Sequence, residues 1–401
     1  MTFIFCEIIT KQYYTLSQHL NRYNRSLGAK PMQKLLYITD QDEYVDHSFI
    51  APLFEVYLKK YMTVDIVYFT DFKSDFEQKD AHRFTVPSRY KNSIISELMH
   101  NGVDIASYDF VMVRNNINIM KHVLKNRETY HYKALYRFSF PKRSIKMCCD
   151  KADNKAGFLS HMFHRSKTKK ETKVINQCDA FLPTSQSMQH TFLPDVNIPS
   201  ILCSPAINPD MLYDNQQHTG TQKRFVYAGT LDKVREFETV LDAFAALEND
   251  NWELLISTRD TLYAQKMLDR YPTIRRKVQI YSAKTKASLL ELISKADIGV
   301  ALLPDIPIYN SSTPVKIFDY YASGVPCLMT DSGHTNSVFT DCVDAWFCDF
   351  TQQDISQKLA YLLSLSKEEV IAVGAKGQQR LLDVKNYKTL AKNIADALQT
   401  L

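Results

Sequence analysis

The sequence lacks the features that assign many proteins to a class at once. No stretch approaches the roughly 20 consecutive apolar residues that a membrane-spanning helix needs. The eight cysteines form no Cys-x-x-Cys pair and no zinc pattern with histidine, so we interpret them as buried free thiols. No low-complexity tract, solenoid repeat or nucleic-acid-binding motif is visible. With 45% hydrophobic and 23% charged residues, the composition predicts a globular protein without a nucleic-acid partner.

The amino-terminal segment is open to several interpretations. Its opening, MTFIFCEIIT, resembles a signal peptide only weakly, because Glu7 and Lys11 interrupt the apolar run and no basic residue precedes it. We therefore expect a cytoplasmic protein. Residues 1–31 have apolar side chains at helical spacing and end near Gly28. They fit a helix on a membrane surface, a packing extension, or a segment upstream of a start at Met32.

Positive charge is concentrated in one quarter of the chain. Residues 101–200 contain 16 Lys and Arg against 8 Asp and Glu, whereas residues 1–100 contain 12 of each. The densest part is residues 164–173. A solvated helix face explains this charge, and so does attraction to an anionic partner such as a membrane surface or a phosphorylated substrate.

Strand-like apolar runs alternate with helical patterns, which predicts an α/β fold with parallel sheets. A chain of 401 residues is too long for one core and predicts two domains. Three prolines and a polar run place their boundary near residues 200–220. Strands are predicted at residues 34–40, 65–70, 109–114, 134–138, 180–183, 224–228, 252–257, 278–281, 298–303 and 325–329, and helices at 48–61, 237–247, 286–295 and 386–398.

Residues 311–331, SSTPVKIFDYYASGVPCLMTD, have the signals of a short helix followed by a buried strand. Thr313 is a suitable N-cap, and Pro314 suits the first helical position because its missing N–H needs no partner there. The helix is predicted to run to about Ala322. Gly324 then ends it in a left-handed conformation.

The start of this helix predicts an anion site. Its unpaired N–H groups and positive dipole end attract negative charge, and Lys316 adds a full positive charge in the first turn. Asp319 lies on the same side, so a plain ion pair with Lys316 is the simpler interpretation when the two are taken alone. However, they lie at the carboxyl edge of a predicted parallel sheet, where α/β folds bind ligands. Together they suit a nucleoside diphosphate, bound through Ser312, Thr313, Pro314, Val315, Lys316 and, at the ribose, Asp319.

The same residues resemble the donor-site segment of family-four glycosyltransferases in its short form, S-x-P-x-K-x-x-E-Y-x-A-x-G-x-P. Asp319 stands where the family usually has glutamate, which shortens its reach toward a ribose. The longer form of the motif has a further glutamate, whose position is Ser311 here. The matching positions are Ser312, Pro314, Lys316, Asp319, Tyr320, Ala322, Gly324 and Pro326.

A second segment, YAGTLDKVREFE from Tyr227, resembles the family's strand–loop segment in which Gly-Arg is followed by Lys. Gly229 keeps its place, Thr230 replaces the arginine and Arg235 replaces the lysine. Because these cations neutralise the leaving diphosphate in the family, the resemblance implies that Arg235 and Lys316 form a clamp. Lys233 is a weaker candidate for the missing charge, and a plain surface position is the alternative for Arg235.

The wider resemblance implies a GT-B fold, in which two Rossmann-like domains with parallel sheets face each other across a cleft. Residues 173–185 and 205–213 resemble the last helix and strand of the amino domain and the linker, and residues 278–304, including Ala283, resemble the segment that reads the base. The implied parts are an uncertain extension (1–31), an acceptor domain (32–205), a donor domain (206–384) and a final helix that packs back on the first domain (385–401).

The resemblance implies a glycosyltransferase, EC 2.4 type, that transfers a sugar with retention from a UDP- or GDP-linked donor to an acceptor hydroxyl. Fixed cations and helix dipoles stabilise the leaving diphosphate in such a reaction. No acidic DxD-type motif stands out, so we expect no metal and no tightly bound cofactor. By family analogy the acceptor is a glycan or lipid-linked molecule of bacterial surface polysaccharide or glycolipid synthesis, with membrane contact through residues 101–200.

The amino half offers weaker candidates. The family often has a histidine on a loop there, and we assign none. Arg114 and Arg137, at strand ends that we expect to face the cleft, suit a donor phosphate or an anionic acceptor, and structural roles fit them equally well. Asp42, Glu43 and Asp46 either lie near the acceptor or belong to a solvated loop. Two alternative functions remain: a paralogue that binds nucleotide or a partner without catalysis, and another GT-B chemistry such as nucleotide-sugar epimerisation.

Overall fold

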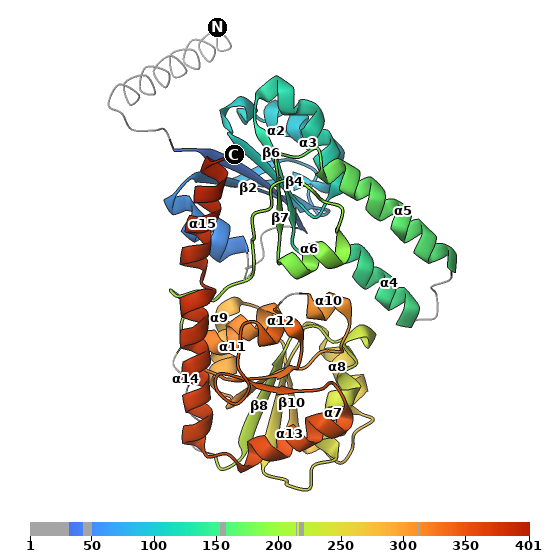
Figure 1. Ribbon diagram of the computed structural model, residues 1–401, viewed down its shortest axis with the longest axis vertical. Helices are drawn as coiled ribbons and strands as arrows, with labels where there is room; N and C mark the ends of the chain where they lie inside the picture. The colour runs from blue at the N-terminus through green and yellow to red at the C-terminus, as the bar shows by residue number, and fades with distance from the viewer. Residues whose placement is uncertain (1–31, 43–49, 153–157, 214, 216–219, 312) are drawn as a thin grey trace.

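The computed structural model describes residues 32–42, 50–152, 158–213, 215, 220–311 and 313–401. The predicted extension (residues 1–31), Glu43, Asp46 and Ser312 lie outside the described residues. The chain forms two α/β halves stacked along the long axis, with one long helix running beside the lower half (Figure 1). Within the described ranges, no helix has the length and apolar character needed to cross a membrane.

The first half is built on a seven-stranded sheet with the order β3-β4-β2-β1-β5-β6-β7. All neighbouring strands are parallel except β3 and β4, which form an antiparallel pair at one edge. The strands are β1 (Lys34–Asp42), β2 (Thr63–Thr70), β3 (Glu77–Asp80), β4 (Arg83–Pro87), β5 (Phe110–Arg114), β6 (Lys133–Phe138) and β7 (Ala180–Pro183).

Helices cover both faces of this sheet, which is why its central strands are apolar without alternation. One face packs against α2 (Ile94–His100), α3 (Ile117–Tyr130), α5 (Phe158–Ile175) and α6 (Gln186–Phe192). The other packs against the helical turns η1 (Ala51–Tyr57) and η2 (Leu58–Lys60) and the last helix, α15 (Tyr387–Gln399). The short turns η3 (Ser88–Ser93) and η4 (Ile105–Ser107) and the cleft helix α4 (Lys142–Ala152) complete this half.

The second half is built on a six-stranded parallel sheet with the order β10-β9-β8-β11-β12-β13. Its strands are β8 (Lys223–Ala228), β9 (Trp252–Ser257), β10 (Val278–Tyr281), β11 (Ile298–Ala301), β12 (Cys327–Thr330) and β13 (Trp346–Cys348). One face packs against α7 (Phe237–Ala245), α8 (Thr261–Leu268) and α13 (Gln352–Ser364), and the other against α9 (Lys286–Ser294), α11 (Val315–Ala322) and α14 (Lys367–Val384). The short elements are η5 (Lys233–Arg235), η6 (Arg275–Lys277), α10 (Pro307–Asn310) and α12 (Gly333–Asn336).

The predicted α/β architecture with parallel sheets is confirmed, and all ten predicted strands are present. The sequence analysis missed the β3–β4 pair and β13. Strand β3 has the polar sequence EQKD at a sheet edge, and β13 is three residues long, so neither has a clear apolar pattern. The predicted helix at residues 48–61 is, in its described part, a π-helical turn followed by a 3₁₀ turn.

The carboxyl ends of the two sheets meet at a cleft. The hydroxyl of Ser185, which follows β7, donates a hydrogen bond to the carbonyl of Ser311, which precedes α11. Helix α4 of the first half also contacts η5 of the second half. Parallel α/β sheets bind ligands at this edge, so the cleft is where the site residues are sought.

Helix α14 packs closely against the turn that follows α11 because Gly374 of α14 has no side chain. A Cβ atom on Gly374 would lie 2.6 Å from the carbonyl oxygen of Gly324 and 2.9 Å from Cδ of Pro326. Gly374→Ala should therefore lower the free energy of unfolding by about 1–3 kcal/mol through overpacking. We expect this loss of stability even though alanine is about 1 kcal/mol more favourable than glycine in the interior of a helix.

Chemical denaturation measures this effect. The matched control is Lys376→Ala, at an exposed position of the same helix, which should change stability by less than about 0.5 kcal/mol. Equal stability of Gly374→Ala and the parent protein would contradict the close contact between α14 and the turn that follows α11.

Candidate functional site

Helix α11 begins without a side-chain cap. Pro314 occupies the N-cap position and offers no side-chain hydrogen bond. The prediction that Thr313 caps the helix is wrong, because the Thr313 side chain is buried and its Oγ1 lies 2.9 Å from Nε2 of His334. At the other end, Gly324 has a φ of 66°, and the Val325 N–H donates to the Tyr320 carbonyl at 3.0 Å, as the C-cap prediction required.

Tyr320 fixes α11 against the sheet. Its hydroxyl accepts a hydrogen bond from the Ala228 N–H at 2.8 Å and donates to the Val300 carbonyl at 3.1 Å. Its ring fills the space beside Gly299, where a Cβ atom would lie only 2.4 Å from the ring. These contacts tie the helix to the ends of β8 and β11 and so determine where the side chain of Lys316 points.

The ammonium group of Lys316 is buried and has no hydrogen-bond partner among the described residues. Its Nζ lies 3.9 Å from the centroid of the Tyr227 ring. Burial lowers the pKa of Lys316 to about 7, and the nearby charge of Arg235 acts in the same direction. A cation–π contact compensates only part of the lost hydration. The site therefore holds a cation that forms no ion pair with any of the described residues.

Arg235 lies at the end of η5, close to this ammonium group. Its backbone N–H donates to Oδ1 of Asp232 at 3.0 Å, and its guanidinium forms an ion pair with the same carboxylate. The guanidinium also lies 5.8 Å from the ring centroid of Tyr309. The Tyr309 hydroxyl is buried without a hydrogen-bond partner in the described part of the chain, and burial raises its pKa to about 12. Two cations and an unused hydroxyl thus share one region.

Gly229 leaves room beside the Lys316 ammonium. A Cβ atom at this position would lie 3.7 Å from Nζ of Lys316 and 3.4 Å from the Tyr227 hydroxyl, and the backbone has a φ of +152°. The Tyr227 hydroxyl donates to the carbonyl of Thr230 at 2.7 Å, which orders the loop after β8. The side chains of Thr230 and Lys233 are exposed at this edge.

Asp319 does not pair with Lys316. Its carboxylate forms an ion pair with Lys286 at the start of α9, and both side chains are 13% exposed. Burial raises the pKa of Asp319, while the charge of Lys286 opposes that shift. Both residues line a mostly apolar cavity of about 110 Å³, which residues of η1 and α15 also line. Asp319, which was predicted to contact a ribose, is therefore already paired with Lys286, a lysine that the sequence analysis did not single out.

The remaining donor-side predictions fall at the rim. Val315 is 37% exposed at the start of α11. Ala283 follows β10 and lines a surface pocket of about 520 Å³ together with neighbouring residues of α9. Ser312 is outside the described residues. No group of His, Cys, Asp and Glu side chains in the described ranges is arranged to hold a metal ion.

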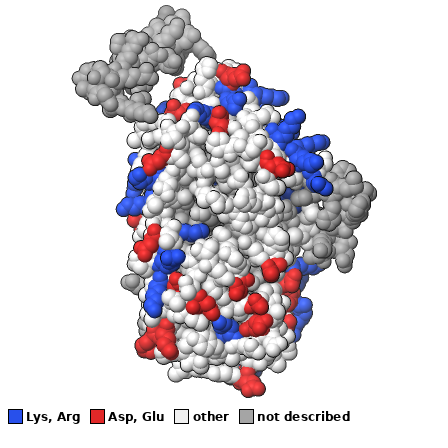
Figure 2. Space-filling view, in the orientation of Figure 1, with Lys and Arg blue, Asp and Glu red and all other residues white. Residues whose placement is uncertain are grey.

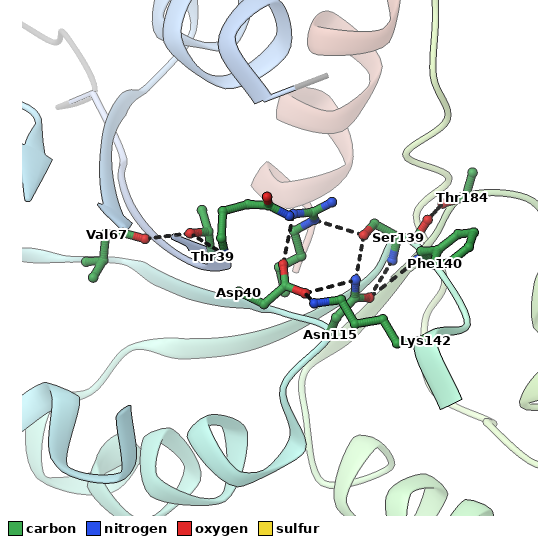
Figure 3. Close-up of polar contacts among 10 residues, drawn as sticks. Thr39, Asp40, Val67, Asn115, Ser139, Phe140, Lys142 and Thr184 are labelled. Carbon is green, nitrogen blue, oxygen red and sulfur yellow. Dashed lines mark hydrogen bonds and ion pairs between the residues drawn. The ribbon is translucent and has the colours of Figure 1, made fainter. Parts of the chain in front are cut away.

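A polar network that includes Asp40, Asn115 and Ser139 lies at the carboxyl ends of β1 and β5 (Figure 3). Arg114 belongs to this network. It donates to Oδ1 of Asp40 and to Oγ of Ser139, both at 2.8 Å. Asn115 and Lys142 contact the other oxygen of Asp40. Burial acts to raise the pKa of Asp40, but the charge of Arg114 and the contact with Lys142 outweigh it, so this pKa lies below its usual value. The carboxylate neutralises Arg114 in the free protein.

Arg137 lies away from the surface of the cleft, at 1% exposure. Its Nη1 donates to the carbonyls of Phe138 and Leu182, both at 2.9 Å, and to Oγ1 of Thr184 at 3.3 Å. Burial lowers its pKa. These bonds join the ends of β6 and β7, which is a structural role, and the structure does not bring Arg137 together with Lys316 and Arg235.

Comparison with known proteins agrees with this architecture. Residues 213–380 match the family described as glycosyl transferases group 1, and this range contains both Arg235 and Lys316. No curated protein matches the sequence significantly. Sucrose-phosphate synthase from Thermosynechococcus elongatus superposes with a TM-score of 0.69 at 12% identity, and the match covers 92% of this chain and 98% of that one.

Two further solved structures extend over both halves. Anabaena HepE, in complex with UDP and glucose, has a TM-score of 0.64 at 10% identity, with 92% and 100% of the two chains covered. An α,α-trehalose-phosphate synthase (UDP-forming) from Burkholderia xenovorans, in complex with glucose-6-phosphate, has a TM-score of 0.65 at 10% identity, with 91% and 100% covered. The chain has the GT-B fold.

Several residues of this GT-B cleft escaped the sequence analysis. Tyr227 and Tyr309 lie under the two cations, and Asp232 holds Arg235. Asp232 is three residues from Arg235 within the matched segment, so local spacing could have identified it. Lys286 is 33 residues from Asp319, and no local pattern connects them.

Removing the buried charge should stabilise the protein. Lys316→Met keeps an unbranched side chain and deletes the ammonium group. Since the pKa of Lys316 is about 7 in the fold against a usual 10.5, the unfolded chain binds more protons between these values. The destabilising effect of the lysine is therefore complete below about pH 7 and declines as the pH rises toward 10.5.

We expect Lys316→Met to raise the free energy of unfolding by about 1–3 kcal/mol at pH 6.5, and by less at pH 9. Denaturant titrations at both pH values measure this. The exposed substitution Lys376→Met serves as the control. A loss of stability at pH 6.5 would show that the ammonium group has a partner.

Proposed function

We propose that the protein is a glycosyltransferase that moves a sugar from a nucleoside-diphosphate sugar to an acceptor hydroxyl. The observation that carries this proposal is the buried Lys316 ammonium beside Arg235, in the part of the chain that matches glycosyl transferases group 1. A buried cation without a counter-ion is costly, and functional sites tolerate such costs when a ligand relieves them.

The diphosphate is the part of the donor that fits this region. Lys316 provides a point charge and Arg235 a planar donor fork, and the uncapped start of α11 adds free N–H groups. Negative charge grows on the leaving diphosphate as the bond to the sugar breaks. Donors that are already in place stabilise that charge more than they stabilise the ground state.

The finer assignment extends the proposal. We propose that transfer proceeds with retention and that the acceptor belongs to bacterial surface polysaccharide or glycolipid synthesis, at the inner face of the plasma membrane. The match of Ser311–Asp331 to the short donor-site motif supports the first point, and the basic region of the first half supports the second. The configuration at the anomeric carbon of the product, measured by NMR, tests retention.

Two observations favour binding without transfer. Asp319, the expected ribose ligand, is paired with Lys286, and Thr230 stands where the related segment has arginine. A paralogue that has kept nucleotide binding but lost turnover would fit these changes. Incubation with a panel of UDP- and GDP-sugars, with nucleotide release as the readout, distinguishes the two functions.

Calorimetry with UDP and GDP tests the site directly. We expect one of the two nucleotides to bind, and Lys316→Met to weaken binding about 10- to 100-fold, because a charge-assisted hydrogen bond to phosphate is lost. Lys376→Met should bind like the parent protein. If neither nucleotide binds, or if Lys316→Met binds as well as the parent, the proposed diphosphate site is wrong.

Nucleotide affinity should also fall as the pH rises above 7. The Lys316 pKa is about 7 in the free protein, and a bound diphosphate favours the charged form and raises that pKa. Below pH 7 the lysine is already charged, so binding needs no proton. Above pH 7 binding takes up a proton, and the affinity falls by at most about tenfold per pH unit.

Calorimetry at pH 8 in two buffers of different ionisation enthalpy measures the proton uptake. Lys316→Met is the control, since it should show no uptake at this pH. Equal heats in the two buffers for the parent protein would mean that Lys316 does not change its protonation when the nucleotide binds.

A further inference from the structure

A second cavity lies in the first half, at the carboxyl ends of β5 and β6. Its volume is about 310 Å³, and we call it the α4–α5 pocket. Asn115 and Phe138 form its wall at the strand ends, the first turns of α4 form another side, and Thr168 and Glu171 of α5 close it. Strands β5 and β6 are parallel neighbours, so the pocket lies at the carboxyl edge of the sheet, where such sheets bind ligands.

The charges of this pocket are unusual for the start of a helix. The first turns of α4 place Lys142, Arg143 and Lys146 at the pocket and contain no acidic residue in the first turn. Cations at a helix amino terminus are disfavoured by the dipole. Glu171 is the one carboxylate among the residues that line the pocket, so the lining side chains carry a net charge of about +2.

Two of these cations already have partners, and one does not. Arg143 forms an ion pair with Glu171 at 2.7 Å, and Lys142 pairs with Asp40 just outside the pocket. Lys146 is exposed and has no ion pair or hydrogen bond among the described residues. The pairs hold the pocket in shape, and Lys146 is the cation that remains for a ligand.

The rest of the lining suits a sugar that bears an anionic group. Phe138, Phe140 and Phe192 provide apolar surface, and Ser144 provides a hydroxyl. Asn115 has a φ of 51° and exchanges hydrogen bonds with Ser139, so this wall is fixed. Aromatic faces beside a few polar groups are typical of small-molecule sites.

Helix α4 connects this pocket to the diphosphate site. It starts at the pocket, and the helix also contacts η5, the turn that ends in Arg235. An 11-residue helix is about 16 Å long. A molecule in the pocket would therefore lie on the same cleft as the donor, on the side of the acceptor half.

We propose that the α4–α5 pocket binds a phosphate group carried by the acceptor, with Lys146 as its main cation. The ligand is an acceptor only if the protein catalyses the proposed glycosyl transfer. The binding of an anion in the pocket can be tested independently of that proposal. A phosphate monoester has a charge of about −1.5 to −2 at pH 7, which is opposite in sign to the formal net charge of the lining. Lysine binds phosphate as a point charge.

Calorimetry without nucleotide tests the pocket, with inorganic phosphate, glucose 6-phosphate and glucose as probes. We expect glucose 6-phosphate to bind more tightly than either of the others. Lys146→Gln should weaken it about tenfold, the loss of one charge-assisted hydrogen bond. The matched control is Lys170→Gln, at an exposed position of α5 that does not line the pocket, and it should change nothing. Equal binding by Lys146→Gln and the parent protein would overturn the proposal.

A second arm identifies the source of the phosphate. Figure 2 shows Lys and Arg side chains gathered on the side of the molecule that carries α5, where Arg165, Lys167, Lys169 and Lys170 are exposed. Phosphatidylcholine vesicles that contain a polyprenyl diphosphate should bind the parent protein, and Lys146→Gln should weaken that binding, if the acceptor is lipid-linked. Binding of glucose 6-phosphate alone indicates a soluble acceptor.

Two results separate this proposal from its neighbours. In the first result, the protein binds phosphatidylglycerol vesicles, and Lys170→Gln weakens this binding. Lys146→Gln changes the binding of neither the vesicles nor the sugar phosphate. The basic side chains of α5 would then form a membrane-binding patch, and the pocket proposal would fail. If the phosphate probes bind as expected but UDP and GDP do not, the anion site stands and the proposed transfer fails. The affinity for UDP in Lys146→Gln should equal that of the parent protein, which excludes damage to the donor site.

Discussion

The structure of the proposed diphosphate site depends on one contact, the Lys316 ammonium held over the ring of Tyr227. A protein interior offers a cation no substitute for water unless an anion or several acceptors are near. Here the helix that carries the lysine is fixed by Tyr320, and Gly229 keeps the adjacent space clear. The free protein therefore holds the charge at a cost. An incoming diphosphate removes that cost and would be bound more tightly for this reason than by a lysine that could swing into solvent.

The two sides of the cleft treat their cations differently. In the first half, Arg114 is neutralised by Asp40, and Arg137 is satisfied largely by carbonyls. In the second half, Arg235 is paired with the carboxylate of Asp232, and Lys316 has no partner among the described residues. A fully paired buried cation has a structural role, because removing its partner leaves a buried charge. A buried cation without a partner is available to bind an anionic ligand. Whether a cation has a partner therefore distinguishes structural residues from candidate ligand-binding residues better than its position in the cleft does.

The sequence predicted the sheet of each half and the helix that carries Lys316, because buried parallel strands and glycine-terminated helices have local signals. It failed where contacts join distant segments. Threonine is a residue type that often caps helices, but the hydroxyl of Thr313 forms a hydrogen bond with His334, 21 residues further along the chain. Arg137 ends a strand like Arg114 does, and only the packing of β7 shows that it is enclosed. The partner of Asp319 belongs to another helix. Local periodicity contains no information about which distant groups a side chain will meet.

The pair of Asp319 and Lys286 links two parts of the second half that the proposed nucleotide would contact together. Lys286 begins α9, directly after the loop that contains Ala283, and Asp319 lies one turn beyond Lys316 on α11. Both side chains are mostly buried, so loss of either partner would leave a charge that the surrounding apolar cavity cannot solvate. The pair therefore fixes the loop that resembles a base-reading segment relative to α11, the helix that carries Lys316. The side chain of Asp319 is one methylene shorter than the glutamate usual at this position, and its carboxylate is already paired with Lys286. Both facts favour this positioning role over direct contact with a ribose.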